Sequence, residues 1–144
     1  MSVTDLTQRS AFRIWCEEKI RFNDLDRHDH VNNLAICAYI ENARVELRER
    51  LFSNLAHDAA IAWLVVNFEV AFRAPVHYPG RVDVGSCSLR VGTSSYLLGH
   101  GVFSGETCVA TAKTTTVFGS RETAKSQPMP EELRSALASL AVAT

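Results

Sequence analysis

The sequence predicts an α+β fold in which a curved antiparallel five-stranded sheet wraps around one long apolar helix, followed by a short C-terminal helix. Two observations predict it. Residues 33–51 carry apolar side chains at helical spacing, and the first half of this segment is apolar on nearly every side. The segments before and after it alternate between apolar and polar residues, which is typical of strands. A helix with so little polar surface has to be covered, so the sheet is expected to curl around it.

The first strand is predicted over residues 12–22, where apolar and charged residues alternate with period two. After a polar turn, Asn32 or Asn33 is a suitable N-cap for a helix that extends to about Leu51. The core-facing stripe of this helix consists of Ile36, Ile40, Ala43, Leu47 and Leu51. The first half of the helix is expected to be covered on all sides. The second half, which is rich in charge from Arg44 onward, is expected to face water.

Four further strands and a short helix complete the predicted fold. The strands are expected over residues 62–73, 81–90, 96–103 and 107–118, and the short turns between the last three predict an antiparallel meander. The pattern slips at Gly85–Ser86, which suggests a bulge. Pro130 at a first helical position, followed by two glutamates, predicts a helix that ends near Leu140. Because this small sheet has edge strands and a partly open face, self-association is expected.

Composition restricts the function classes. The 144 residues predict one domain over 1–144, and 15 basic residues against 16 acidic ones, with no basic block, do not indicate nucleic-acid binding. No apolar run is long enough to span a bilayer and the N-terminus lacks the pattern of a leader, so a cytoplasmic protein without a membrane partner is expected. Four widely spaced cysteines are interpreted as reduced core residues rather than a zinc site: Cys16, Cys37, Cys87 and Cys108.

Titratable residues are concentrated between Arg21 and Asn33. Within seven residues lie Asp24, Asp26, His28, Asp29 and His30. Like charges held close together shift each other's pKa, so an ordered turn that carries them is a candidate site. The alternative is a solvated loop whose side chains shape turns and cap the helix. These residues come from one short turn and have no distant partner of suitable spacing, so no metal site is predicted.

Four motifs in the chain carry a resemblance. They are Asp24-Leu25-Asp26, then His30-Val31-Asn32-Asn33, then Tyr39-Ile40-Glu41-Asn42-Ala43-Arg44, and finally Val91-Gly92-Thr93-Ser94-Ser95. This pattern resembles the signature of hotdog-fold acyl-CoA thioesterases of the 4-hydroxybenzoyl-CoA thioesterase family. The resemblance implies the hotdog fold and hydrolysis of an acyl-CoA ester to a carboxylic acid and CoA. It also implies a reaction without a cofactor, in a cleft between the subunits of a homodimer or homotetramer.

The resemblance assigns roles to individual residues. Asp26 is the catalytic carboxylate, as nucleophile or general base, and Asp24 shapes the turn. His30 and Asn33 belong to the same catalytic group, with His30 fixing the loop or moving a proton. The backbone amides of residues 31–33, at the positive end of the helix, are the candidate donors to an oxyanion. The expected substrate contacts are Val31, Asn32, Tyr39, Ser94 and Ser95.

Departures from the family pattern leave alternatives open. His28 stands where carrier-protein thioesterases with a similar arrangement have asparagine, and Asp29 stands where a small residue is common. The alternatives are a carrier-protein thioesterase and a non-catalytic module that binds acyl-CoA or acyl-carrier protein. A hydratase is disfavoured because its motifs are not recognisable. Glu41 and Glu69 are possible alternative carboxylates, interpreted as solvated residues. Arginines available for the CoA phosphates are Arg73, Arg81 and Arg90.

Overall fold

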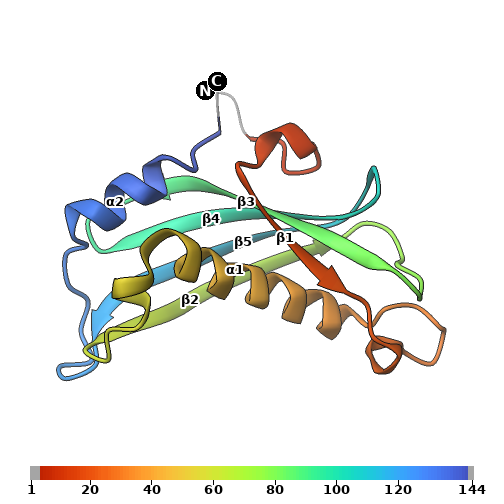
Figure 1. The fold of residues 1–144 in the computed structure, drawn as a ribbon, viewed down its shortest axis with the longest axis horizontal. Coiled ribbons are helices and arrows are strands. Elements are labelled where there is room, and N and C mark those ends of the chain that lie inside the picture. Colours follow the sequence, from red (N-terminus) through yellow and green to blue (C-terminus); the bar gives the residue numbers. More distant parts are fainter. Residues whose placement is uncertain (1–3, 143–144) are drawn as a thin grey trace.

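The computed structural model describes residues 4–142. The prediction that the N-terminus carries no leader falls in part on residues 1–3, which lie outside the described residues. Its five strands are β1 (Ile14–Lys19), β2 (Ile61–Phe72), β3 (Arg81–Val91), β4 (Ser95–Ser104) and β5 (Thr107–Ser120). They form one antiparallel sheet in the order β1-β3-β4-β5-β2. The helices α1 (Asn33–Ala56) and α2 (Glu131–Ala138) lie against one face of this curved sheet (Figure 1). The predicted α+β architecture and the β3-β4-β5 meander are confirmed.

Helix α1 forms where its apolar stripe can be buried by the sheet. Ile36, Ile40, Ala43 and Leu47 are all at most 4 % exposed, and they pack against the inner faces of β3, β4 and β5. Full burial of each large aliphatic side chain contributes roughly 1.5–3 kcal/mol, so this stripe fixes the position of the helix. The side chain of Asn32 accepts a hydrogen bond of 2.8 Å from the amide of Leu34, and Asn32 is thus the N-cap.

The outer face of the sheet is covered in part by the N-terminal segment, which includes the 3-10 helix η1 (Arg9–Ala11). Leu6 and Phe12 pack directly against glycines of β3 and β4. A Cβ atom at Gly85 or Gly101 would lie 2.6 Å from the ring of Phe12. Phe12 therefore packs on the outer face instead of continuing the strand, and β1 begins two residues later than predicted.

Several predicted boundaries need correction. The first strand ends at Lys19 rather than residue 22, because a 3-10 helix, η2 (Phe22–Asp24), follows it. Helix α1 continues to Ala56 with a kink at Phe52, whose ring stacks on Trp63 with centroids 5.6 Å apart. The register shift of β3 falls between Ser88 and Arg90, not at Gly85–Ser86, and β2 has a shift at Val66 that was not predicted.

Three further corrections concern individual residues. Pro130 is the N-cap of α2 rather than its first helical residue. Only Cys87 is buried; the other three cysteines are half-buried, and all four are free thiols. Leu34, on the helix half that was expected to be covered all round, is 77 % exposed, whereas Arg44, which was expected to face water, is only 7 % exposed. The flank of α1 beside β2 is thus uncovered in a single chain.

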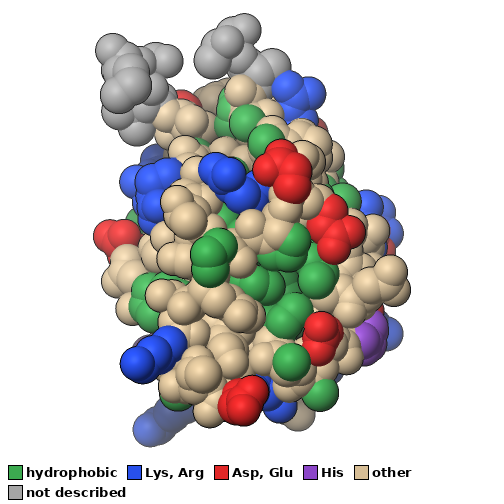
Figure 2. Space-filling model, turned by 90° about the vertical axis from the view of Figure 1, so that its left-hand side faces the viewer, with side chains coloured by type: hydrophobic (Ala, Val, Ile, Leu, Met, Phe, Trp, Pro, Cys, Tyr) green, Lys and Arg blue, Asp and Glu red, His purple; other side chains and the backbone are tan. Residues whose placement is uncertain are grey.

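Helix α2 closes the end of the molecule where α1 finishes. Its residues Leu133 and Leu137 are fully buried, and the carbonyl of Leu137 accepts a 2.6 Å hydrogen bond from the Ser88 hydroxyl of β3. The surface at this end shows hydrophobic side chains among Lys, Arg, Asp and Glu (Figure 2). Neither described helix has the length and hydropathy needed to cross a bilayer.

Candidate active site

Asp24 anchors the turn that leads into α1. Its side chain is 4 % exposed and accepts hydrogen bonds from the Arg21 amide at 2.9 Å, the Arg21 guanidinium at 3.0 Å and the Tyr39 hydroxyl at 2.5 Å. Burial alone would raise the pKa of Asp24, but the hydrogen bonds from Tyr39 and Arg21 outweigh it and hold the pKa below its ordinary value. The Asp24 carbonyl also accepts from the amide of Asn32. This aspartate ties the turn to the helix, in agreement with its predicted role.

Asp26 is held by the backbone that follows it. Its Oδ1 accepts hydrogen bonds from the amides of His28 at 2.8 Å and His30 at 3.2 Å. The amide of Asp26 in turn donates to the carbonyl of His30. The hydrogen bond from the His28 amide, aided by that from His30, lowers the pKa of Asp26, so this half-buried carboxylate is ionised at neutral pH. Among residues 4–142, Oδ2 has no hydrogen-bond donor and remains available.

The three predicted oxyanion amides differ in availability. The amide of Val31 donates to the carbonyl of Val76, and that of Asn32 donates to the carbonyl of Asp24, both at 2.8 Å. The amide of Asn33, the first residue of α1, has no acceptor in the described part of the chain. The helix dipole adds positive potential at this position. Of the three predicted donors, only the amide of Asn33 is therefore free to bind an incoming oxygen.

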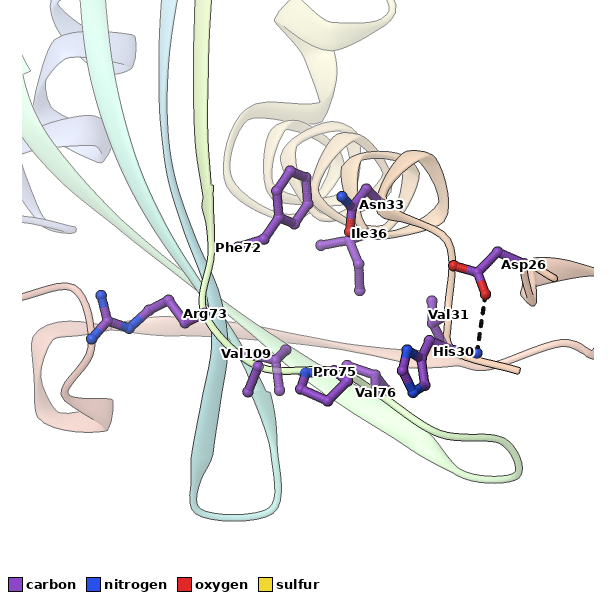
Figure 3. A pocket seen from close by; sticks show the side chains of 11 residues that line it. Asp26, His30, Val31, Asn33, Ile36, Phe72, Arg73, Pro75, Val76 and Val109 are labelled. Atoms are coloured by element: carbon purple, nitrogen blue, oxygen red, sulfur yellow. Dashed lines mark hydrogen bonds between the residues drawn. The ribbon is translucent and has the colours of Figure 1, made fainter. Parts of the chain in front are cut away.

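A cavity of about 300 Å³ lies beside this turn. Asp26, His30, Val31 and Asn33 line one side of it. The other side comes from the end of β2 and the segment after it, together with Val109 of β5 (Figure 3). The walls away from Asp26 are largely apolar and include Ile36, Phe72, Val76 and Val109. The cavity thus brings the Asp26 carboxylate and Asn33, the first residue of α1, next to an apolar surface.

His30 lies on the cavity wall against a second histidine. Its backbone forms an isolated antiparallel bridge with His77, and the two rings meet edge to face with centroids 4.9 Å apart. No side-chain hydrogen bond of the His30 imidazole is present within residues 4–142. This geometry explains how His30 holds the loop, because its amide bonds Asp26 while its ring is supported by His77.

Several predicted contacts do not lie at this cavity in a single chain. The Tyr39 side chain is buried and its hydroxyl donates a hydrogen bond to Asp24, and the Asn32 side chain caps the helix. Ser94 and Ser95 lie at the turn between β3 and β4, where the Ser94 carbonyl accepts from the amide of Phe118. Glu41 and Glu69 are exposed, as interpreted from the sequence.

The sequence did not identify the second wall of the cavity. The sequence names Arg73 as available for the CoA phosphates and Ala74–Pro75 as the end of a strand, but it places neither these residues nor Val109 beside Asp26. They meet the turn because Val31 pairs with Val76, and because the amide of Arg73 donates to the carbonyl of Val109 at 2.8 Å. Both contacts join segments far apart in the chain, so no local pattern could reveal them. The His77 ring was missed for the same reason.

The residues described here include no group of three or more His, Cys, Asp or Glu side chains placed to hold a metal ion. His28 is exposed and His30 faces the cavity. The functional groups that the site presents are therefore a carboxylate, an imidazole and a free backbone amide.

Comparisons with known proteins agree with this geometry. Residues 20–137 match the model of the thioesterase-like superfamily. Among solved structures, the PA5185 protein of Pseudomonas aeruginosa is 26 % identical, with a TM-score of 0.84, and the match covers 94 % of this chain and 96 % of that one. The PA2801 protein of the same organism, for which a thioesterase function has been suggested, is 30 % identical with a TM-score of 0.78, over 85 % of this chain and 95 % of the other.

A third similar structure is a thioesterase of Thermus thermophilus in complex with coenzyme A and zinc. It is 27 % identical, with a TM-score of 0.78, over 90 % of this chain and 95 % of that one. A comparison with curated proteins finds no match. The superfamily match begins just after β1 and extends into α2, so it includes the turn, the central helix and the strands β2 to β5. The chain therefore belongs to the thioesterase-like superfamily of thioester hydrolases and has the hotdog fold.

Proposed function

We propose that this protein is an acyl-CoA thioesterase that hydrolyses its substrate to a carboxylic acid and CoA. One observation carries the proposal: the ionised Asp26 and Asn33, whose backbone amide has no acceptor among the described residues, line the same cavity of about 300 Å³. Thioester hydrolysis needs a group that attacks the carbonyl carbon or activates water, and donors for the developing oxyanion. Asp26 and the start of α1 supply these two elements from adjacent positions.

Two routes are compatible with this arrangement. As a nucleophile, Oδ2 of Asp26 attacks the thioester carbon, the C–S bond breaks, and the CoA thiolate leaves and takes up a proton. Water then hydrolyses the mixed anhydride and regenerates the carboxylate. As a general base, Asp26 removes a proton from the attacking water instead. In both routes the carbonyl oxygen is expected to bind the Asn33 amide, where the dipole of α1 stabilises negative charge.

His30 is expected to hold the Asp26 loop and to face the leaving sulfur, to which an imidazole can deliver a proton. Val31 contributes an apolar wall, and Asn32 acts through the helix start that it caps. We further assign the acyl group to the apolar walls of the cavity. Arg73 lies at the mouth with its side chain directed away from Asp26, in a position to meet a phosphate of CoA (Figure 3). The coenzyme A complex of the similar Thermus protein supports this choice of substrate.

The active unit is proposed to be a homodimer, or a homotetramer built from it. β2 is an edge strand of the sheet. Large apolar side chains are exposed on this strand and on the adjacent start of α1: Val65, Val66, Phe68 and Phe72 of β2, and Leu34 of α1. Such an edge is normally paired or covered. In this arrangement Ser94 and Ser95 would contact the pantetheine arm from the second subunit, and Tyr39 would act only through Asp24. The unpaired cysteines fit a reducing compartment such as the cytoplasm.

The test compares Asp26→Asn with Asp29→Asn. The side-chain oxygen of the asparagine introduced at position 26 can still accept both backbone hydrogen bonds, so the turn is retained while the charge is lost. Asp29 is an exposed residue of the same turn with φ of 61°, a conformation that asparagine tolerates well, and it serves as the matched control. Thiol release from a panel of aromatic, short-chain and long-chain acyl-CoA and acyl-carrier-protein esters is measured.

We expect Asp26→Asn to lower kcat by at least about 100-fold, while Asp29→Asn is close to wild type. An unchanged rate in Asp26→Asn would refute the catalytic assignment. Tight binding of acyl-CoA by the wild-type protein without thiol release would indicate a binding module, and a preference for carrier-protein esters would change the substrate class.

A further inference from the structure

Burial divides the residues around the Asp26 cavity into a floor and a rim. The floor consists of the four lining side chains that are at most 5 % exposed: Val31, Ile36, Val76 and Val109. The rim consists of the exposed lining residues: Asn33, Phe72, Arg73 and Pro75. The cavity therefore opens to solvent on one side and is closed by apolar side chains on the other.

The floor is rigid. All four of its side chains belong to one core cluster, which also contains residues of α1, β3, β4 and β5. They are all β-branched, and such side chains have few rotamers. Val31 and Val76 are further fixed by the 2.8 Å hydrogen bond between their backbones. Because protein cores are packed as densely as organic crystals, a ligand cannot pass behind this floor without displacing core side chains.

The reacting groups lie at one end of the cavity, and its apolar walls extend from there. Asp26 is on one side, and Phe72 and Val109 lie across the cavity from it (Figure 3). In the proposed function Asp26 holds the thioester carbon. The acyl group then extends over the floor toward Val109, whereas the CoA leaves through the rim. The distance from Asp26 to the far end of the floor therefore limits the length of the acyl group.

The volume of the cavity gives this limit a size. About 300 Å³ is at the lower end of the range of about 300–1,000 Å³ that is usual for small-molecule sites. At about 30 Å³ for a group the size of a water molecule, the cavity holds roughly ten such groups. The carbonyl oxygen and the sulfur take up part of this volume, which leaves room for a chain of about eight carbons, including the carbonyl carbon.

We infer that this protein is selective for acyl-CoA esters whose acyl group has about eight carbons or fewer, and that Val76 and Val109 set this limit. The inference rests on the proposed function, because it takes the thioester to be held at Asp26. A longer chain has to turn back through the rim into water. Methylene groups within the limit gain affinity by burial, and those beyond it gain none. Since one chain supplies the whole floor, the limit does not depend on how subunits pair.

The test measures binding rather than turnover. The probes are S-(2-oxoalkyl)-CoA thioethers, in which a methylene group between the sulfur and the carbonyl carbon prevents hydrolysis. Isothermal titration calorimetry gives the Kd for chains from acetyl to palmitoyl length. We expect the Kd of the wild-type protein to fall roughly fourfold with each added carbon, because a buried methylene contributes about 0.8 kcal/mol. Beyond about eight carbons the Kd should stay constant.

Two valine substitutions assign the limit to the floor. Val109→Ala deepens the floor, and Val102→Ala is its matched control, because Val102 is fully buried in the same core cluster but does not line the cavity. Both changes remove the same methyl groups, so they should cost similar stability, and circular dichroism checks the fold. We expect the break in Kd to move to chains about two carbons longer in Val109→Ala and to stay at the wild-type length in Val102→Ala. If Val109→Ala does not fold, Val76→Ala replaces it.

Three results would overturn the inference: a wild-type Kd that keeps falling up to palmitoyl length, a break that moves equally in Val109→Ala and Val102→Ala, or a protein that binds none of the probes. The proposed chemistry is tested separately, by thiol release in wild type and Asp26→Asn. A protein that shows the break in Kd but releases no thiol would support the length limit and refute the hydrolysis. Release of thiol from palmitoyl-CoA with the same kcat/KM as from butyryl-CoA would refute the limit and support the hydrolysis.

Discussion

The hydrogen bond between Tyr39 and Asp24 provides a sensitive test of how the site is supported. Burial raises the pKa of Tyr39, so its hydroxyl stays protonated and donates to Asp24 at 2.5 Å. Tyr39→Phe removes this donor and leaves the carboxylate in the same buried place. A hydrogen bond to a charged group contributes about 1.5–3 kcal/mol, so we expect the free energy of unfolding to fall by that amount. For a protein of this size the melting temperature should fall by about 5–12 °C.

Urea unfolding at fixed protein concentration measures this loss, with Tyr78→Phe as control. Tyr78 is 46 % exposed and lies near the same turn, so its substitution should change stability by less than about 0.5 kcal/mol. Because the folded state lowers the pKa of Asp24, its stabilisation is fully present above the unfolded pKa of about 3.9 and is lost as the pH falls through the lower folded value. The deficit of Tyr39→Phe should therefore be constant from pH 8 to 5 and shrink below about pH 4. Equal stabilities of Tyr39→Phe and wild type at pH 7 would refute the support that we assign to this bond.

Three further predictions concern the sheet and the carboxylate. Gly85→Ala should lower stability by about 1–3 kcal/mol, because its Cβ would meet Phe12 at 2.6 Å, and the loss should be smaller in a Phe12→Ala background; urea unfolding of the four proteins measures the coupling. Burial lowers the pKa of His100 to about 3, so as the pH falls the unfolded state binds a proton before the folded state does. The free energy of unfolding should therefore fall by about 2 kcal/mol between pH 7 and pH 5 through this group. A His100 NMR signal that titrates in this pH range would contradict the prediction. In a single turnover in ¹⁸O-labelled water, label in the Asp26 side chain would identify Asp26 as the nucleophile of an anhydride that water opens at the Asp26 carboxyl carbon. Label only in the product results from the general-base route and also from water attack on the acyl carbon of the anhydride.

Local sequence patterns were sufficient for the order and type of the five strands and the two α-helices, but not for the 3-10 helices η1 and η2. The alternation before Lys19 indicates a strand with one buried face, and the stripe from Ile36 to Leu47 indicates a helix with one buried face. The predicted start of the first strand at Phe12 was wrong because contacts with other strands determine it: the Phe12 ring packs on Gly85 of β3 and Gly101 of β4. The same holds for the bulges, which depend on pairing between strands.

The candidate site was predicted on one side only. Asp26, His30, Val31 and Asn33 fall in one continuous turn, so a local motif could identify them. The opposite wall reaches the turn through bonds between distant segments, such as Val31 to Val76, and was missed. Arg44 shows the limit most clearly. An arginine in the charged half of a helix is normally placed in solvent, and its burial follows only from the position of β2 beside α1.

The turn also bears on which of the two proposed routes Asp26 follows. A general base works best when its pKa is near the working pH, and the amides of His28 and His30 move the pKa of Asp26 the other way. These bonds engage Oδ1 and leave Oδ2 free, which fixes the carboxylate in one orientation. The orientation, with Oδ2 free, suits attack on a thioester carbon, which needs no proton transfer to the carboxylate, whereas the lowered pKa makes Asp26 a weaker base toward water. The hydrogen bonds that hold the loop therefore favour the nucleophilic route within the proposed mechanism.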